Sequence, residues 1–163
     1  MTQAPPGGLL IEPGDPFAPD VAVLLRHSEE YARSLYPPES VHMIPVEELV
    51  SPSVRFLVAR DQDTGRLLGC GAVVLHADGW AELKRMFVDP AARRRGVGTA
   101  ILDALERLAR AEGVAVIRLE TGTRQGEAIA LYRRFGYQVR GPFADYWDDP
   151  LSVFMERRLD EHR

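Results

Sequence analysis

The chain has 163 residues with one cysteine and four histidines, which excludes an internal disulfide and disfavours a metal site built from these side chains. Its formal net charge of −4 disfavours nucleic acid as a partner, because domains that bind nucleic acid usually carry excess basic charge. No apolar run is long enough to span a bilayer and the amino terminus lacks a signal-peptide pattern, so we expect a cytoplasmic protein with no membrane partner and no bound metal.

The first half of the chain alternates short strands with helical segments. The length is typical of one domain, residues 1–163, in which residues 1–8 are expected to be loose because they are rich in proline and glycine. We expect a strand at 9–12, a helix from 19 or 20 that ends before Pro37, a short helix at 45–50, and strands at 54–60 and 67–75. The turn at 61–65 joins the last two strands in a hairpin, and Cys70 is expected to pack in the core.

The stretch from Gly79 to Gly98 organises the rest of the chain. An apolar-rich strand ends at Asp89-Pro90, since proline discourages further pairing. A basic, glycine-containing loop follows, and an amphipathic helix begins at Thr99. Unpaired N–H groups and the positive dipole end at a helix start form an anion site, and glycines let a phosphate approach the backbone. We therefore expect this loop to hold a phosphorylated ligand.

The second half continues with alternating strands and helices. Glu112-Gly113 ends the helix, and the apolar, β-branched run at 114–120 predicts a strand buried on both faces. We then expect a loop at 121–126, a helix through 128–135, a strand at 137–140, a loop at 141–150 and a closing strand at 152–158. The strand–helix–strand–helix order requires parallel pairing, whereas hairpins are antiparallel, so the predicted fold class is α/β with a mixed sheet.

Two motifs carry a resemblance to a known family. Residues 93–98, Arg-Arg-Arg-Gly-Val-Gly, lack the third glycine of a dinucleotide-binding motif and the lysine of a P-loop. They match Arg/Gln-x-x-Gly-x-Gly/Ala and resemble the acetyl-CoA pyrophosphate loop of the GNAT superfamily of N-acetyltransferases. Taken alone, such a run of arginines is equally compatible with a solvated turn.

The second motif lies on the following helix. Residues 125–137 resemble the superfamily's Asn-x-x-Ala-x-x-Leu-Tyr-x-x-x-Gly-Phe signature, with Gln125 in place of asparagine and Tyr137 in place of phenylalanine. The resemblance implies a single-domain GNAT fold whose mixed, mostly antiparallel sheet has six to seven strands, is splayed at the cofactor cleft and is accompanied by about four helices. It also implies acetyl-CoA as co-substrate, while the longer side chain of Gln125 leaves its contact with the cofactor open.

By the same resemblance, three segments hold acetyl-CoA. Backbone groups of the central strand are implied to hold the acetyl carbonyl and the pantetheine, and the basic loop to hold the pyrophosphate. The residues so implied are Met86, Phe87, Val88, Arg93, Arg94, Arg95, Gly96, Val97, Gly98, Thr99, Gln125, Ala128 and Tyr132.

The chemistry needs a base, because a lysine-like amine has a pKa of ~10.4 in water, and the departing thiolate benefits from an acid. The resemblance implies Tyr132 as the general acid, with a packing role in the core as its alternative. Glu82 takes the place of the general base in some superfamily members, and its alternative is an ion pair with Lys84 or Arg85. Glu120 is the rival base, since these two acids alone lie on the strands that flank the predicted cleft.

The acceptor is the least determined part of the prediction. The residues expected to line its pocket, because their segments flank the cleft in the family, are Tyr31, Tyr36, His42, Phe143, Tyr146 and Trp147. Asp145, Asp148 and Asp149 would favour a cationic amine, but a solvated acidic loop is the simpler interpretation. We expect a small-molecule primary amine or an amino-acid-like acceptor. The alternatives are a protein lysine or amino terminus, or a non-catalytic acyl-CoA-binding module, and a homodimer is left open.

Overall fold

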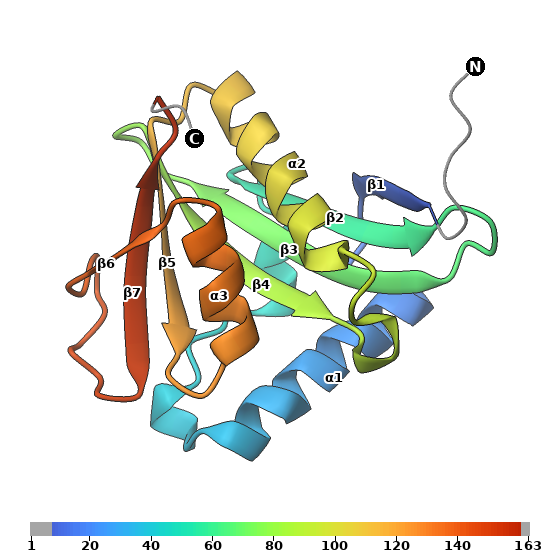
Figure 1. The fold of residues 1–163 in the computed structure, drawn as a ribbon, viewed down its shortest axis with the longest axis horizontal. Coiled ribbons are helices and arrows are strands. Elements are labelled where there is room, and N and C mark those ends of the chain that lie inside the picture. Colours follow the sequence, from blue (N-terminus) through green and yellow to red (C-terminus); the bar gives the residue numbers. More distant parts are fainter. Residues whose placement is uncertain (1–7, 161–163) are drawn as a thin grey trace.

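The computed structural model describes residues 8–160, in which one mixed sheet has helices on both faces (Figure 1). The predicted loose segment at 1–8 lies, apart from Gly8, outside these residues. The strands are β1 (Leu9–Pro13), β2 (Val54–Asp61), β3 (Leu67–Leu75), β4 (Trp80–Val88), β5 (Val116–Gly122), β6 (Gln138–Arg140) and β7 (Ser152–Arg158). The α-helices are α1 (Pro19–Leu35), α2 (Val97–Ala111) and α3 (Gly126–Arg134), and the short 3-10 segments are η1 (Pro38–Ser40), η2 (Val46–Val50) and η3 (Pro90–Ala92).

The strand order is β1-β2-β3-β4-β5-β7-β6, and every neighbouring pair except β4 and β5 is antiparallel. The parallel pairing runs from Trp80 opposite Val116 to Leu83 opposite Leu119. Both strands continue beyond these pairs, and Figure 1 shows them diverging there. The prediction of an α/β fold with a mixed, mostly antiparallel sheet of six to seven splayed strands is therefore confirmed.

Two apolar layers hold the sheet. On one face, α2 buries Ile101 and Leu105 in the same cluster as Met155 of β7. On the other face, α1 buries Leu25 in a cluster that includes Cys70, as predicted for this cysteine, and burial raises the pKa of its thiol to about 12. Complete burial of one large aliphatic side chain contributes about 1.5–3 kcal/mol, so these layers fix the helices against the sheet.

The turns at predicted positions adopt conformations that their residues favour. In the β2–β3 hairpin, the Asp61 carboxylate accepts the backbone N–H groups of Asp63 and Thr64, and Gly65 has a φ of +74°. Gly113 follows the end of α2 with a φ of +82°, the left-handed conformation that favours glycine after a helix.

Two helix details are refined by the structure. Three α-helices lie among residues 8–160, and the short helix predicted at 45–50 is present as the 3-10 segment η2. Helix α2 begins at Val97 rather than Thr99, since the left-handed backbone of Gly96 already turns the chain into the helix.

Strand β5 also differs from its prediction. It runs from Val116 to Gly122 rather than over 114–120, and buried residues alternate with half-buried ones instead of being buried on both faces. Ile117 and Leu119 join the core under α2, whereas Arg118 and Glu120 face the opposite side of the sheet. The strand is therefore amphipathic, and its second face is available for polar contacts.

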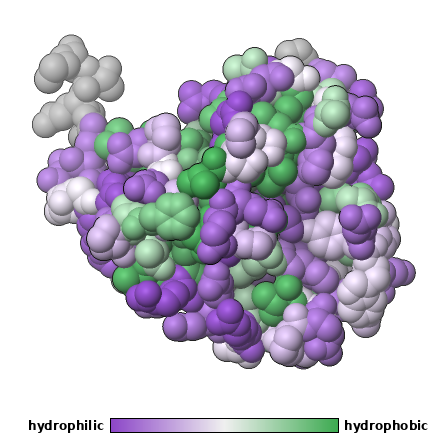
Figure 2. All heavy atoms as spheres, turned by 180° about the vertical axis from the view of Figure 1, so that it is seen from behind, coloured by the Kyte–Doolittle hydropathy of each residue, from purple (hydrophilic) through white to green (hydrophobic). Residues whose placement is uncertain are grey.

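The surface opposite the view of Figure 1 is predominantly polar, with apolar residues in groups separated by hydrophilic ones (Figure 2). Separate apolar groups of this kind are ordinary on the surface of a folded chain. Within residues 8–160, no helix combines the length and apolar character needed to cross a bilayer.

Candidate functional site

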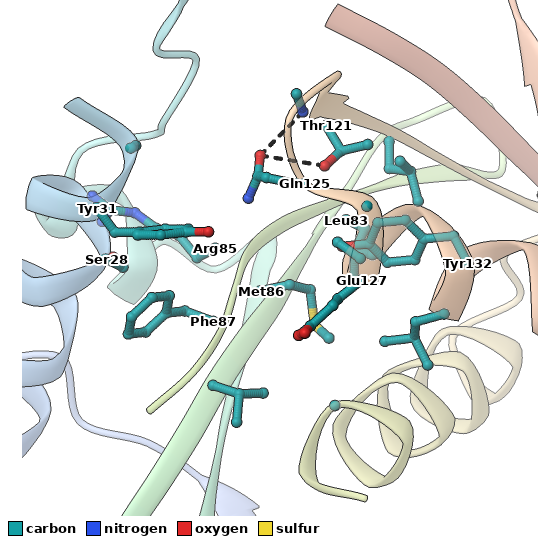
Figure 3. Close-up of a pocket in the computed structure, with 18 of the residues that line it drawn as sticks. Ser28, Tyr31, Leu83, Arg85, Met86, Phe87, Thr121, Gln125, Glu127 and Tyr132 are labelled. Atoms are coloured by element: carbon teal, nitrogen blue, oxygen red, sulfur yellow. Dashed lines mark hydrogen bonds between the residues drawn. The ribbon is translucent and has the colours of Figure 1, made fainter. Parts of the chain in front are cut away.

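A pocket of about 820 Å³ opens where β4 and β5 diverge. Its walls come from α1, the loop at 40–43, the ends of β4 and β5, the amino-terminal part of α2 and the whole length of α3. Figure 3 shows side chains from α1, β4, β5 and α3 arranged around this shared space. The splay of two parallel strands therefore gathers segments that are far apart in the sequence.

Strand β4 carries a bulge beside the pocket. Arg85 and Met86 together oppose the single residue Gly71 of β3, and Arg85 has a left-handed backbone with a φ of 59°. A Cβ at Gly71 would meet the Met86 sulfur at 2.5 Å, so glycine makes room for this side chain. Past Leu83 the edge of β4 faces the pocket instead of β5. A strand edge of this kind can exchange hydrogen bonds with an extended ligand.

The start of α2 forms an anion site on the pocket wall. Gly96 is the N-cap with a φ of 75°, and residues 96–99 line the pocket. The N–H groups of a first helical turn and the positive end of the helix dipole attract anions. A Cβ at Gly98 would lie 3.2 Å from Leu131 of α3, so glycine also lets the two helices approach closely here.

The three arginines before α2 have different surroundings. Arg93 and Arg94 line the pocket, whereas Arg95 forms an ion pair of 2.8 Å with Asp61 in the β2–β3 turn. Hydrogen bonds from the turn, mainly from Thr64, and the one from Arg95 lower the pKa of Asp61 to about 2. The structure thus brings two of the three predicted arginines to the pocket, while the third binds the hairpin.

The other residues predicted to hold the cofactor converge on the same space. Those that line the pocket are Met86, Phe87, Val88, Arg93, Arg94, Gly96, Val97, Gly98, Thr99, Gln125, Ala128 and Tyr132. Within residues 8–160, no group of three or more histidine, cysteine or acidic side chains is arranged to hold a metal ion.

Tyr132, the predicted general acid, is a buried residue on the pocket wall. Its ring packs against Tyr137 with 5.8 Å between the ring centroids. Burial, and to a lesser extent the charge of Glu120, raises the pKa of Tyr132 above its ordinary value. The phenol therefore stays protonated at neutral pH and can donate to a group inside the pocket.

Gln125 stands at the N-cap position of α3. Its side-chain oxygen accepts the backbone N–H of Gly122 at 3.1 Å and the Thr121 hydroxyl at 3.5 Å (Figure 3). The Tyr36 hydroxyl lies 3.5 Å from the same oxygen and accepts the backbone N–H of Arg124 at 3.1 Å. A Cβ at Gly122 would overlap that hydroxyl. These contacts join the end of α1 to the β5–α3 turn, a link that sequence reasoning missed.

Of the two predicted bases, Glu120 lines the pocket. The Ser152 hydroxyl donates a hydrogen bond of 2.7 Å to its carboxylate. Burial raises the pKa of Glu120, against the smaller opposing effects of Ser152, His42 and Lys84. A carboxylate in this environment accepts a proton closer to neutral pH than an exposed glutamate does.

Glu82 lies behind the pocket wall, where it is 7% exposed and is not among the lining residues described. The Lys84 ammonium lies 3.1 Å from its carboxylate, and the Tyr146 hydroxyl donates to it. Lys84 also donates to that hydroxyl and, at 3.0 Å, to the His42 carbonyl. The ion pair that was the structural alternative for Glu82 is therefore present, and it ties two loops to β4.

The residues predicted for the acceptor side divide into two groups. Tyr31, Tyr36 and His42 line the pocket, whereas Trp147 is 51% exposed and is not among the lining residues described. Phe143 is buried and contacts Tyr146 edge-on, with 5.0 Å between ring centroids, and neither is among the lining residues described. Burial, followed by the charge of Glu82, raises the pKa of Tyr146. These two aromatic residues support the wall from behind.

The acidic loop differs from its prediction at one residue. Asp145 and Asp148 are exposed as expected, but Asp149 is only 2% exposed, with a carboxylate oxygen 3.4 Å from His42 Nε2. Burial raises the pKa of Asp149, but hydrogen bonds, including one from the backbone N–H of Leu151 at 2.9 Å, outweigh this effect and lower it. In a turn, an aspartate carboxylate commonly accepts the backbone N–H two residues further along the chain. The pair Asp149 and Leu151 fits this pattern, which could have indicated that Asp149 is held inside the loop.

The chain is similar in sequence to known proteins. Residues 21–137 match the model of the Acetyltransferase (GNAT) family. A relative from Azospirillum brasilense, named IAA acetyltransferase, is 44% identical over 145 residues, which span 88% of this chain and 94% of the relative.

Solved structures show the same architecture. The crystal structure of a candidate acyl-CoA N-acyltransferase from Klebsiella pneumoniae has a TM-score of 0.78 and 38% identity, and the match covers 93% of this chain and 97% of that one. The PaiA N-acetyltransferase of Thermoplasma acidophilum, solved in complex with coenzyme A, has a TM-score of 0.70 at 17% identity, with 93% and 99% of the two chains covered. The latter likeness shows the fold alone.

Proposed function

This chain belongs to the GNAT acetyltransferase family, and from that premise we propose that it transfers the acetyl group of acetyl-CoA to the primary amine of a small molecule. The family uses acetyl-CoA as its acyl donor. The observation that carries the proposal is a single pocket that joins an anion site at the start of α2 to a phenol, Tyr132, and a half-buried carboxylate, Glu120. The acceptor amine attacks directly within a ternary complex.

In this proposal the pyrophosphate lies at residues 93–99. The first-turn N–H groups of α2 and the guanidinium groups of Arg93 and Arg94 bind it, with Arg95 supporting the hairpin instead. The pantetheine runs along the free edge of β4 at Met86–Val88, where backbone groups face the pocket. A backbone N–H of the bulge then stabilises the oxyanion that forms on the acetyl carbonyl.

The reaction requires three proton transfers. Glu120 takes the proton of the acceptor ammonium, and the neutral amine nitrogen then attacks the thioester carbonyl carbon. When the tetrahedral intermediate collapses, the carbon–sulfur bond breaks and Tyr132 gives its proton to the departing sulfur. The attacking nitrogen loses its second proton to the resulting Tyr132 phenolate, which leaves the neutral amide and restores the phenol. We assign the base to Glu120 rather than Glu82 because Glu120 lines the pocket, whereas Glu82 is occupied by Lys84 and Tyr146.

The acceptor side supports a small molecule. It is enclosed by α1 and the loop at 40–43 and shares one pocket of about 820 Å³ with the cofactor, which leaves limited room for a folded protein surface. The relative named IAA acetyltransferase makes IAA one compound to include among the acceptors tested.

The test measures release of free CoA with panels of small amines, peptides and IAA, with mass spectrometry of the products. We expect an N-acetylated small amine to form, and the Tyr132→Phe variant to form it more slowly. Faster acetylation of peptides would assign the protein-acetyltransferase alternative. Tight binding of acetyl-CoA without turnover of any amine would assign the non-catalytic module.

A further inference from the structure

Arg85 combines two uncommon features on the pocket wall. Its backbone is left-handed at the β4 bulge, with a φ of 59°, a conformation that residues other than glycine rarely adopt. Its side chain is 2% exposed, although guanidinium groups are almost never buried without a full set of partners. Strained backbone and a buried cation at a pocket together indicate a residue that binds something there.

The hydrogen bonds of Arg85 leave one end of its guanidinium unused. Nε and Nη2 donate to the Ile44 carbonyl at 3.2 and 2.7 Å, and Nη2 also donates to the Glu29 carboxylate at 2.8 Å. The buried Nη1 atom has no hydrogen-bond partner in the structure. A buried donor without a partner destabilises the protein, so an acceptor oxygen from a ligand is the expected complement.

The charge around Arg85 favours an anionic ligand. Its carboxylate partner, Glu29, is shared with the exposed Arg33 at 3.9 Å, so one negative charge serves two guanidinium groups. The neighbouring cation Lys84 is already paired with Glu82. The counter-charge of Arg85 is therefore shared and reaches only its Nη2 end, while the carboxylate of Glu120 lies on the β5 side of the same pocket.

A second donor lines the same pocket. Tyr31 of α1 is 36% exposed, and Figure 3 shows its hydroxyl directed toward the shared space. A planar guanidinium and a hydroxyl on one pocket wall suit a carboxylate, which has two acceptor oxygens.

We infer that Arg85, assisted by Tyr31, binds a carboxylate group of the acceptor, so that the acceptor is an amino acid or a similar amine that also bears a carboxylate. The inference rests on the proposed function, in which the amine of this acceptor is acetylated. Because Nη1 is out of contact with solvent, the carboxylate displaces part of the wall as it enters. Arg85 then determines which amines bind, and Glu120 takes the ammonium proton.

The test compares each common L-amino acid with its carboxamide, which keeps the amine and side chain but removes the negative charge. Binding is measured by calorimetry on CoA-saturated protein, and turnover by CoA release. In the wild type we expect at least one amino acid to be preferred over its carboxamide by about 10- to 100-fold, the range typical of a charge-assisted hydrogen bond. In Arg85→Gln the amino acid and its carboxamide should bind about equally. The affinity for the amino acid should fall, while the affinity for the carboxamide should change little.

Three further variants separate recognition from structure. Arg33→Gln removes a positive charge beside the same Glu29 but outside the pocket lining described, so it should keep the preference. Tyr31→Phe should reduce it by a few-fold, and Arg85→Lys should restore part of it. If Arg85→Gln does not fold, Tyr31→Phe and Arg85→Lys still report on the same ratio.

Failure of this inference is distinguishable from failure of the proposed function. Equal binding of amino acids and carboxamides by the wild type would overturn it, as would an equal loss for both compounds in Arg85→Gln. If amino acids bind selectively but no amine is acetylated, the carboxylate site stands and the proposed reaction fails. If carboxamides and simple amines are acetylated best, the reaction stands and the carboxylate site fails.

Discussion

The Lys84 ammonium lies 3.1 Å from the Glu82 carboxylate, and both side chains are nearly buried. A carboxylate held in this way already has its counter-charge, and it lies behind the pocket wall rather than among the lining residues described. Glu120, on the neighbouring strand, has burial rather than a full ion pair as the main influence on its pKa. The two acids on the flanking strands therefore have different surroundings. Replacing Glu120 should mainly lower activity, whereas replacing Glu82 should mainly lower stability.

Glu120→Gln should lower kcat by about 100-fold or more, since general-base catalysis commonly contributes 10²–10⁴-fold, with partial recovery at high pH, where the acceptor deprotonates unaided. Glu82→Gln should leave kcat within about threefold but cost about 2–4 kcal/mol of unfolding free energy, because it leaves the buried Lys84 without its counter-charge. Steady-state kinetics and chemical denaturation of both variants check this. The reverse pattern would return the role of base to Glu82.

The pH dependence of the protein's stability should also report the ionisation of Glu120. Its pKa is raised in the folded protein, so its contribution to stability is fully present below the unfolded pKa of about 4.3 and is lost as pH rises through the folded value. Relative to the wild type, Glu120→Gln should gain thermal stability as pH increases through that range. A Tm difference that does not change with pH would mean that burial does not perturb this carboxyl group.

Tyr132→Phe should lower kcat by at least about tenfold while leaving the Kd for CoA nearly unchanged, because only an interaction formed late in the reaction is removed. The burial of the ring should be preserved, since phenylalanine has the same shape without the hydroxyl. Calorimetry with CoA and single-turnover rates measure the two quantities. Turnover at the wild-type rate would reduce Tyr132 to a packing residue.

Gly96→Val should weaken CoA binding by at least about tenfold, because it places a side chain and backbone strain at the expected phosphate site. Gly65→Val is a matched control, since Gly65 has a φ of 74° and Gly96 a φ of 75°, but Gly65 lies in the β2–β3 hairpin. Both variants should lose a similar amount of unfolding free energy, about 1–2 kcal/mol. Equal CoA affinity in the two folded variants would exclude the α2 start as the phosphate site.

Arg94→Ala and Arg95→Ala should separate cofactor binding from hairpin stability. Arg94 lines the pocket, so its loss should weaken CoA binding by about 5- to 20-fold, with a smaller effect at high salt. Arg95 is paired with Asp61, so its loss should change CoA affinity little. Calorimetry at two salt concentrations tests this, and a larger loss of affinity in Arg95→Ala would contradict it.

The sequence predicted the elements with strong local signals. Asp89-Pro90 ended β4, Gly113 ended α2, and the Arg-x-x-Gly-x-Gly run marked the helix start at the pocket. These features depend on proline, glycine and helical periodicity, which act within a few residues of the chain.

The choice between the two acids could not be predicted, because it depends on where two strands separate. Glu82 lies in the stretch of β4 that pairs with β5, whereas Glu120 comes just after the last pair, Leu83 with Leu119. One residue therefore sits in a closed part of the sheet and the other in its opening. The burial of Asp149 is equally long-range, since it requires the loop to fold against His42.

The contact between Tyr36 and the turn at Gly122 has a consequence for how this enzyme can diversify. The hydroxyl of Tyr36 occupies the space that any side chain at position 122 would need, so a tyrosine at position 36 requires a glycine at position 122. A homologue that changes its acceptor by altering α1 must therefore keep this pair of residues compatible. A relative that receives residues 19–36 of this chain should therefore fold well only where its residue 122 is glycine or is changed to glycine with the segment.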